Sequence, residues 1–243
     1  MSEVRSLGIL YEDMSCIVAE KPQGIPSEDG SGETLPSLLR ALRKERGEPQ
    51  EIYPVHRLDK PTGGAILYAK TKDSAAFYSS AVAHRELGKR YLAVLSGTPE
   101  VSFGELSDYL YHDKRTNKVF VVKGERKGAK SARLEYRTVE TVMHEGMPLT
   151  LAEINLKTGR THQIRVQFAS RKLPLYGDRR YGAGTSLPGG RIALWSHCLI
   201  FTGQGMSEAK SVTSLPPCEF PWNLFPAIDA LRKDKDRADL QNV

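Results

Sequence analysis

A short stretch of the chain, residues 56–64, combines side chains that could do chemistry with residues that restrict the backbone. It reads His-Arg-Leu-Asp-Lys-Pro-Thr-Gly-Gly, so the carboxylate of Asp59 stands between two cations. Pro61 fixes its own φ and favours extended geometry at the residue before it, while Gly63 and Gly64 permit close backbone approaches. A stiff loop of this kind could hold a nucleophilic carboxylate still, although an Asp beside an Arg in such a loop is also typical of turns and surface ion pairs.

The apolar runs around this loop predict the strands that position it. Residues 65–69 form a short apolar run of strand length, so we expect Asp59 to lie on the lead-in to a core strand. Two earlier runs, 8–13 and 16–19, are predicted to be strands joined by a turn. The stiff loop is therefore expected to sit on a sheet.

Two helices are predicted to flank these strands. Leucines at helical spacing follow Thr34, a plausible N-cap, and Gly47 is a plausible stop. A second helix is expected to begin at Thr71 or Asp73 and to run to about His84. Its small residues suggest close packing against the sheet.

A second chemistry-bearing stretch lies at residues 157–165, Lys-Thr-Gly-Arg-Thr-His-Gln-Ile-Arg, directly after a predicted strand over 149–156. Thr161 is a natural N-cap for a helix, which must end before a proline at position 174. Ile164 and a phenylalanine four residues later would form the apolar face of that helix, with other side chains on a different face.

Basic residues are clustered rather than spread evenly. The net charge is +6 over 243 residues, yet residues 114–133 hold eight Lys and Arg against a single acid. A strand over 119–122, a loop over 123–130 and a partner strand over 131–139 are expected to form a basic hairpin. Its side chains Lys123, Arg126, Lys127 and Lys130 would suit contact with the backbone of a nucleic acid such as RNA. A membrane surface as partner, or a solvated basic surface without a partner, is the alternative.

Composition excludes several classes of protein. The three cysteines are widely separated and the histidines show no paired spacing, so neither a disulfide framework nor a metal site is indicated. No uncharged run approaches the length needed to cross a bilayer. We expect a protein of the reducing cytoplasm that contacts no membrane and acts as a monomer.

Four motifs together resemble the RluA-type family of RNA pseudouridine synthases. These are the HRLDKPTGG stretch, the Lys-x-Tyr at residues 89–91, the Gly-Arg-Thr-His-Gln-Ile-Arg at 159–165, and a Pro-x-x-Gly-Asp-x-x-Tyr-Gly at 174–182. A Lys-Pro-x-Gly turn at 21–24 is also similar to the opening of the family's catalytic domain. The chain has Gly63 where the family most often has Ser, a departure that leaves the aspartate and its preceding arginine unchanged.

The resemblance implies a fold and a reaction. The fold would be α+β, with a long, mixed, mostly antiparallel bent sheet, flanking helices and a central cleft. The reaction would isomerise uridine to pseudouridine within ribosomal or transfer RNA, at a structured stem-loop, without cofactor or metal. Resemblance covers nearly the whole chain, so we expect one catalytic domain over 1–243, with a core of about 8–228, a charged tail over 229–243 and no separate N-terminal RNA-binding domain.

The resemblance also implies roles for single residues. Asp59 would be the nucleophile, at carbon 6 of the base or carbon 1 of the ribose, Tyr91 would lie over the target base, and Arg165 would pair with the aspartate. Further contacts with substrate or RNA are expected from the remaining motif residues, His56, Arg57, Lys89, Arg160, Thr161, His162 and Ile164. Arg57 would enter the base stack in support of a flipped nucleotide.

Two other functions stay open on these residues. A catalytically silent RNA-binding or assembly factor could use the same cleft only to bind, although binding alone would not require Asp59, Tyr91 and Arg165 together. A hydrolase or glycosylase would leave an abasic product instead of an isomer.

Overall fold

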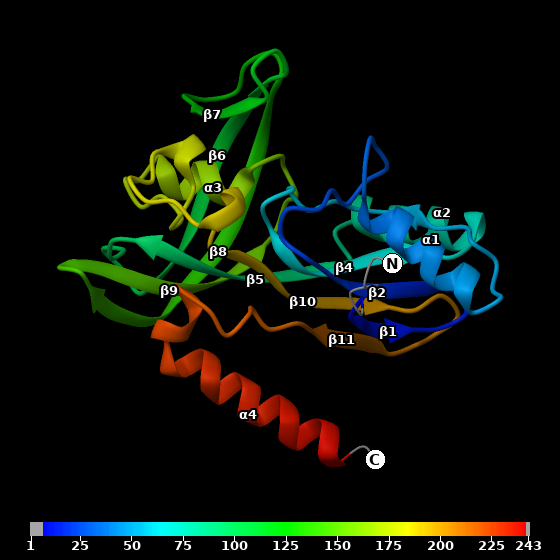
Figure 1. The fold of residues 1–243 in the computed structure, drawn as a ribbon. Helices are drawn as coiled ribbons and strands as arrows, with labels where there is room; N and C mark the ends of the chain where they lie inside the picture. Colours follow the sequence, from blue (N-terminus) through cyan, green and yellow to red (C-terminus); the bar gives the residue numbers. More distant parts are fainter. Residues whose placement is uncertain (1–6, 242–243) are drawn as a thin grey trace. The chain divides into compact units, whose positions relative to one another are not determined.

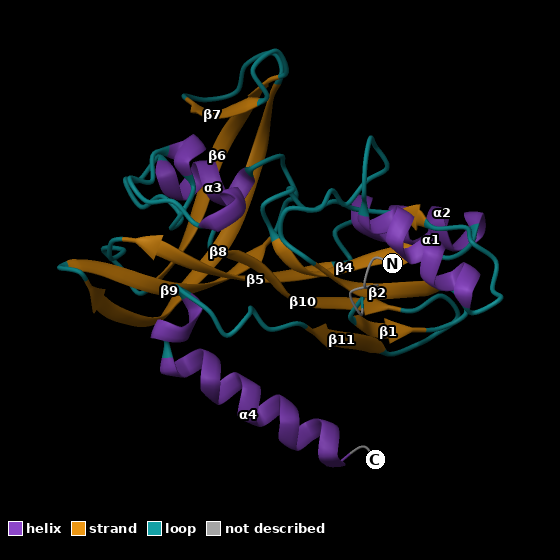
Figure 2. Ribbon diagram, in the orientation of Figure 1, coloured by secondary structure: helices purple, strands orange, loops and turns teal. Residues whose placement is uncertain are grey.

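The computed structural model describes residues 7–241, which adopt an α+β fold and form two compact units. Within the described range, the first unit comprises 7–89 and 196–214, and the second comprises 90–195 and 215–241. Figure 1 shows the course of the chain, and Figure 2 separates its helices from its strands. The two ends of the single predicted domain, 1–6 and 242–243, lie outside the described residues.

Four strand pairs of the first unit, β1–β2, β2–β4, β3–β4 and β10–β11, are antiparallel. β2 pairs with both β1 and β4, β3 adds to β4, β10 is the other neighbour of β4, and β11 pairs with β10. Every residue of β4 is buried, as its unbroken apolar sequence predicts. The predicted strands on either side of Asp59 are confirmed. The bounds are β1 (Ile9–Glu12), β2 (Cys16–Lys21), β3 (Tyr53–Pro54), β4 (Gly63–Ala69), β10 (Leu194–Thr202) and β11 (Ala209–Thr213).

The two helices of the first unit, α1 (Leu35–Glu45) and α2 (Lys72–Ala83), begin where their caps predict. Thr34 and Thr71 each accept a hydrogen bond from the backbone N–H three residues on, and a serine there returns a contact to the cap backbone. These reciprocal capping boxes satisfy N–H groups that a helix start otherwise leaves without partners. The chain leaves α1 through Gly47 at φ 70°, which confirms the predicted stop.

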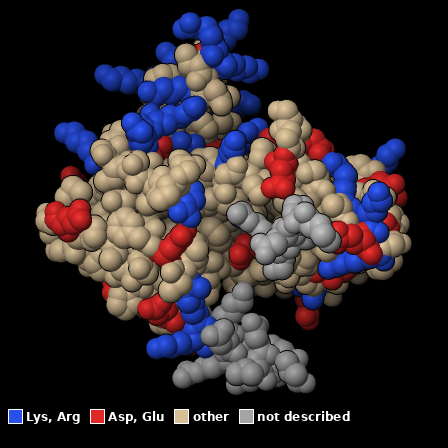
Figure 3. All heavy atoms as spheres, viewed as in Figure 1, with Lys and Arg blue, Asp and Glu red and all other residues tan. Residues whose placement is uncertain are grey.

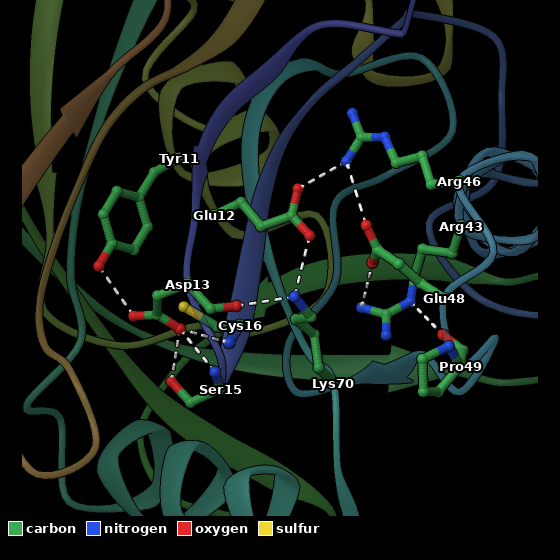
Figure 4. A network of polar contacts seen from close by, with 10 residues as sticks. All are labelled: Tyr11, Glu12, Asp13, Ser15, Cys16, Arg43, Arg46, Glu48, Pro49 and Lys70. Carbon is green, nitrogen blue, oxygen red and sulfur yellow. Dashed lines mark hydrogen bonds and ion pairs between the residues drawn. The ribbon is translucent and has the colours of Figure 1, made fainter.

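A polar network joins the ends of β1, β2 and β4, as Figure 4 shows. In the β1–β2 turn, Asp13 Oδ1 accepts hydrogen bonds from the backbone N–H groups of Ser15 at 2.7 Å and Cys16 at 2.8 Å. The ammonium of Lys70, directly after β4, donates to Glu12 Oε1 at 2.9 Å and to the backbone oxygen of Asp13 at 2.8 Å. The network fixes the ends of these strands opposite to the end that carries the Asp59 loop.

The strands of the second unit follow the order β5–β9–β8–β6–β7, and the pairs β5–β9, β9–β8, β8–β6 and β6–β7 are antiparallel. β8 contains an irregularity between Thr138 and Glu140 where it pairs with β9. The chain enters this unit within β5 and leaves it within β10. The bounds are β5 (Gly88–Ser96), β6 (Phe103–Asp113), β7 (Lys118–Val122), β8 (Ala129–His144) and β9 (Met147–Leu156).

The predicted pairing of the basic hairpin is wrong. β7 pairs with β6 rather than with β8, and β8 pairs with the other edge of β6. The hairpin is therefore β6–β7, and residues 123–128 form a loop that carries the chain past β6 into β8. The sequence of β6 mixes polar and apolar residues with only Leu106 and Leu110 fully buried, so no apolar run marks it as a strand.

The helices of the second unit are α3 (Gln163–Ala169) and α4 (Pro226–Gln241), with short 3₁₀ turns η1 (Arg179–Tyr181), η2 (Pro188–Gly190) and η3 (Trp222–Leu224). The expectation that Thr161 caps α3 is wrong, because the N-cap is His162, at a left-handed φ of 52° and without a side-chain cap bond. Ile164 and Phe168 are both buried, as predicted, and the helix ends before Pro174. The charged tail is helical within the described range, and α4, which contains it, is anchored by Ile228 in a core with Trp222 and Phe225.

Candidate active site

The loop that carries Asp59 is braced from inside by Lys21, a fully buried lysine at the end of β2. Its ammonium donates to the backbone oxygens of Pro22 at 2.9 Å, Ile25 at 2.7 Å and Lys60 at 3.2 Å. Burial lowers the pKa of Lys21 to about 7, and the charge of Asp59 opposes that shift. Lys21 thus ties the turn after β2 to the residue that follows Asp59, and its charge lies within electrostatic reach of the carboxylate.

Further hydrogen bonds close the same loop. The backbone N–H of Thr62 donates to the backbone oxygen of Asp59 at 2.9 Å, and the N–H of Gly24 donates to that of Lys60 at 2.8 Å. The side-chain amide of Gln23 donates to the backbone oxygen of Pro61 at 2.7 Å. The Lys-Pro-x-Gly turn at 21–24 therefore serves as the platform on which the Asp59 loop rests.

Gly64 allows the loop to enter β4. Its φ is 107°, and a Cβ built on it would lie 2.3 Å from the backbone oxygen of Ser196 on β10. Only glycine combines that backbone conformation with so close an approach. The second glycine of the HRLDKPTGG stretch thus sets how closely β4 and β10 lie where the loop ends.

His56 and Arg57 precede Asp59 in the loop and lie in different environments. The backbone N–H of Leu67 donates to His56 Nε2 at 3.1 Å, so the neutral ring carries its proton on Nδ1. Burial, with a smaller contribution from the charge of Lys89, holds the pKa of His56 well below its usual value. Arg57 is exposed and forms an ion pair with Glu28 at 3.0 Å. His56 is therefore a neutral anchor between the loop and β4, whereas Arg57 is accessible to a ligand.

Tyr91 and Lys89 lie on β5. Tyr91 is 5% exposed and stands opposite Ile154 of β9, so most of its ring is covered by protein. Lys89 is half-buried, and burial lowers its pKa to about 8. A proton can therefore leave this ammonium much nearer neutral pH than it leaves an exposed lysine.

Arg165 lies on α3 and is held by a buried carboxylate. Its Nε donates to Asp178 Oδ2 at 2.6 Å and its Nη2 donates to Asp178 Oδ1 at 2.9 Å, with 6% and 1% of the two side chains exposed. The guanidinium also lies over the ring of Tyr181, with 5.2 Å between Cζ and the ring centroid. A planar fork paired in this way keeps one orientation.

The other predicted residues of the same motif have separate contacts. Arg160 Nε donates to the backbone oxygen of Ser131 at 2.9 Å, which ties the residue to β8. Thr161 is half-buried, Ile164 is buried, and the Nδ1 of His162 makes a hydrogen bond of 2.8 Å with the hydroxyl of Tyr181. The motif thus supplies both the position of Arg165 and the surroundings that fix it.

The four basic residues predicted to contact RNA, here called the basic tip, are all exposed: Lys123, Arg126, Lys127 and Lys130. Figure 3 shows Lys and Arg side chains gathered over the end of the β6–β7 hairpin and the loop beyond it. The guanidinium of Arg126 lies 4.7 Å from the ring centroid of Tyr111 on β6, an arrangement typical of a cation–π contact. The tip therefore presents positive charge, and one of its guanidinium groups is packed on an aromatic ring.

The site residues fall into two groups that the structure describes separately. Asp59 lies in the first unit with His56, Arg57 and Lys89, whereas Tyr91 and Arg165 lie in the second. The pairing of Arg165 with Asp59 stays a prediction. Sequence reasoning gave no role to Lys21, Asp178 or Tyr181, although all three stand in motifs that it quoted.

Two observations bear on cofactors and membranes. Among residues 7–241 there is no group of three or more His, Cys, Asp and Glu side chains placed to hold a metal ion. None of the helices in that range combines the length and the apolar character that crossing a membrane requires.

Comparison with known proteins gives consistent results. The family model of RNA pseudouridylate synthases matches residues 15–170. Ribosomal large subunit pseudouridine synthase D of Xanthomonas campestris is 32% identical, over 96% of this chain and 71% of that protein. The RNA pseudouridine synthase YhcT of Bacillus subtilis, itself uncharacterized, is 34% identical over 76% of this chain.

The chain is shorter than several of these relatives. It spans 61% of the Bacillus protein and 55% of ribosomal large subunit pseudouridine synthase D of Borreliella burgdorferi. The solved structure of human RNA Pseudouridylate Synthase Domain Containing 1 matches with a TM-score of 0.74 at 23% identity, over 95% of this chain and 89% of that one, which shows a shared fold. The fold, the match over residues 15–170 and the Xanthomonas relative agree: this chain belongs to the RNA pseudouridylate synthase family.

Proposed function

We propose that this protein isomerises uridine to pseudouridine within an RNA chain. The observation that carries the proposal is the Asp59 loop, which buried Lys21 and the close contact at Gly64 hold in one conformation. A nucleophilic carboxylate must be presented without rearrangement if it is to attack a base or sugar carbon. Membership of the pseudouridylate synthase family supports the same activity.

In the proposed reaction Asp59 attacks either carbon 6 of the uracil or carbon 1 of the ribose. The glycosidic bond to nitrogen 1 breaks, the uracil turns, and a new bond forms from its carbon 5 to the ribose. The bond to Asp59 breaks again, the hydrogen of carbon 5 leaves as a proton, and nitrogen 1 takes up a proton. No oxidant, metal or cofactor is needed for this balance. Arg165 is assigned to pair with Asp59, and Tyr91 to lie against the target base.

Access to the base requires that the target nucleotide leave its stack. We assign Arg57 to fill the space that the flipped nucleotide leaves in the base stack. Its side chain is exposed, and so is that of Glu28, with which it forms an ion pair. Such a pair contributes little to stability, so RNA phosphates or bases can displace Glu28 at small cost.

We propose large-subunit ribosomal RNA as the first substrate to test, at a uridine in a structured stem-loop, with transfer RNA as the alternative. Support comes from the names of relatives from Xanthomonas and Borreliella, which are ribosomal large subunit pseudouridine synthases. The exposed basic tip supports contact with an RNA backbone. We further propose that the enzyme is a monomer and acts in the cytoplasm.

The test is release of tritium from RNA that carries the label on carbon 5 of uridine, transcribed in vitro so that it holds no modification. We expect the wild-type protein to release tritium and to leave the chain without abasic sites. Asp59→Asn should bind RNA and release none, because an amide is isosteric with the acid but is not a nucleophilic anion. Asp73→Asn is the matched control: Asp73 is exposed on α2, and the variant should retain wild-type turnover.

The other functions give different results in the same assay. A silent RNA-binding factor would bind without tritium release, and a glycosylase would leave abasic sites. Turnover by Asp59→Asn near the wild-type rate would overturn the assignment of the nucleophile.

A further inference from the structure

Asp178 and Tyr181 belong to the Pro-x-x-Gly-Asp-x-x-Tyr-Gly motif and contact Arg165. The chemistry assigned above gives neither residue a role. Asp178 accepts two hydrogen bonds from the guanidinium, at 2.6 and 2.9 Å. Tyr181 lies across the face of the same group, 5.2 Å from Cζ to the ring centroid. One residue therefore fixes the edge of the guanidinium and the other fixes its plane.

The hydroxyl of Tyr181 has two partners of its own. It accepts a hydrogen bond of 3.0 Å from the backbone N–H of Val119 on β7, and it makes a bond of 2.8 Å with His162 Nδ1. Burial raises the pKa of Tyr181, so the phenol keeps its proton and can donate it to His162. His162 holds a left-handed φ of 52° at the start of α3, a conformation that needs support from contacts outside the helix.

The segment that contains Tyr181 is joined to the β6–β7 hairpin at more than one point. Besides the bond to Val119, Arg180 Nη1 donates to the backbone oxygen of Asn117 at 2.7 Å, in the turn between β6 and β7. Val166 of α3 packs in one apolar cluster with Val119 and Leu110 of the hairpin, and Tyr181 lies against that cluster. The hairpin, α3 and the 3₁₀ turn η1 are therefore one packed group within the second unit.

We propose that Tyr181 is a positioning residue, which orients Arg165 by linking it and the start of α3 to the backbone of strand β7. The hairpin then has two separable roles: its backbone orients Arg165 through Tyr181, while the side chains of its basic tip contact RNA. This inference rests on the proposed function, because it concerns the orientation of a residue assigned to pair with Asp59.

The test compares Tyr181→Phe and Tyr181→Leu in single-turnover reactions on the RNA that the wild-type protein modifies. Phe keeps the ring over the guanidinium and loses the hydroxyl, so we expect the rate constant at saturating RNA to fall about tenfold. Leu also loses the aromatic face, and the rate constant should fall further. RNA affinity should stay at the wild-type value, since neither variant changes the basic tip.

Tyr109→Phe is the matched control. Tyr109 lies on β6 of the same hairpin, and its hydroxyl makes no hydrogen bond within the described part of the chain. We expect it to behave as wild type in both rate and affinity. Asp178→Asn is a poor first choice, because removing the buried carboxylate that holds the Arg165 guanidinium can prevent folding.

The rate constant separates positioning from a general loss of structure. With protein in excess over RNA, a partly unfolded preparation still converts all of the RNA at an unchanged saturated rate constant, whereas misplaced Arg165 lowers that rate constant. An unchanged rate constant in Tyr181→Phe overturns the positioning role, whether or not amplitude or affinity falls. A wild-type protein that releases no more tritium than Asp59→Asn overturns the proposed function and the positioning role with it.

Discussion

Arg165 and Asp178 form a buried ion pair in which two guanidinium nitrogens face two carboxylate oxygens, at 2.6 and 2.9 Å. The pair joins the Gly-Arg-Thr-His-Gln-Ile-Arg motif to the Pro-x-x-Gly-Asp-x-x-Tyr-Gly motif, so residues of two sequence motifs form one buried contact. A buried pair of this kind costs desolvation when it forms, but losing one partner leaves an uncompensated charge in the interior. Variants of Arg165 therefore test stability and chemistry together.

Arg165→Met should lower the free energy of unfolding by about 3–5 kcal/mol, because Asp178 keeps its buried carboxylate without a cation. Urea unfolding of the wild-type and variant proteins at neutral pH measures this difference in free energy. Arg40→Met is the control: Arg40 also forms a two-pronged pair, with Asp29, but both partners are partly exposed, and we expect a loss of about 1 kcal/mol or less. Equal losses in the two variants would show that the Arg165–Asp178 pair is not a buried charge pair in solution.

Arg165→Lys separates activity from stability. Lysine keeps the positive charge near Asp178 but cannot form the planar fork, so the protein should stay folded while the orientation of the charge is lost. We expect a fall in single-turnover rate of about tenfold or more with intact thermal unfolding. A wild-type rate in this variant would show that the fork geometry of Arg165 plays no part in catalysis.

Gly64→Ala should destabilise the protein and slow turnover. A left-handed backbone conformation costs a non-glycine residue about 1–2 kcal/mol, and forcing a methyl group into a filled space costs about 1–3 kcal/mol more. The contact in question is with the backbone of Ser196, which cannot rotate away as a side chain can. Displaced strands would carry the Asp59 loop with them.

Gly205→Ala is the control for strain alone. Its φ is 78°, and a Cβ there meets no heavy atom within 4 Å. We expect a loss of about 1 kcal/mol without an effect on turnover. If the two alanine variants unfold at the same urea concentration, the close approach at Gly64 is not a constraint on the fold.

Much of the Asp59 loop and its surroundings could be predicted from sequence, because local rules determine them. Thr34 and Thr71 cap helices through contacts three residues away, and the apolar run of β4 has no alternative to burial. Strand β6 could not be predicted in the same way. Its polar side chains face solvent on one side, so it lacks an apolar run, and only its pairing with β7 and β8 identifies it.

The contacts that fix the site residues depend on tertiary structure. Lys21 belongs to a residue type that is almost always exposed, and its burial follows from three backbone oxygens that converge only in the folded loop. The partner of Arg165 is 13 positions away along the chain and not on the same helix, so no spacing rule points to it. Sequence motifs identified which segments matter, whereas packing determined what each side chain does.

Lys21 should make stability depend on pH in a defined direction. Its folded pKa is about 7 and its ordinary value is 10.5, so between these values the unfolded chain binds a proton that the folded chain does not. Stability therefore rises with pH across this window, by up to about 1.4 kcal/mol per pH unit from this group, and the contribution is lost as pH falls through about 7.

Urea unfolding of the wild-type protein and of Lys21→Met, from pH 6.5 to 10, measures the effect. Methionine fills similar volume and cannot titrate, so the difference between the two proteins should change steeply above pH 7. Lys72→Met, on the exposed surface of α2, is the control and should show the wild-type slope. A constant difference between wild type and Lys21→Met across this range would mean that the buried ammonium keeps its proton.

The basic tip should govern RNA affinity without governing the rate of the chemical step. Replacing Lys123, Arg126, Lys127 and Lys130 together by Gln should weaken RNA binding and flatten its salt dependence, by roughly 0.7 to 0.9 of a log–log unit for each phosphate that the protein no longer neutralises. Binding measured by fluorescence anisotropy at several salt concentrations gives both quantities. The matched control replaces four exposed basic residues outside the tip by Gln: Lys44, Lys72, Arg85 and Lys233.

The single-turnover rate distinguishes the two roles that the hairpin carries. The four tip side chains are exposed, whereas Tyr181 contacts the hairpin through the backbone N–H of Val119, so Gln at the tip leaves that hydrogen bond intact. The rate at saturating RNA should therefore stay near wild type while the concentration needed for half-saturation rises. If the tip is only a solvated surface, the tip variant will match its control in both affinity and salt slope. A lower saturated rate with unchanged affinity would contradict both views, and would instead imply that the tip closes over the flipped base during the reaction.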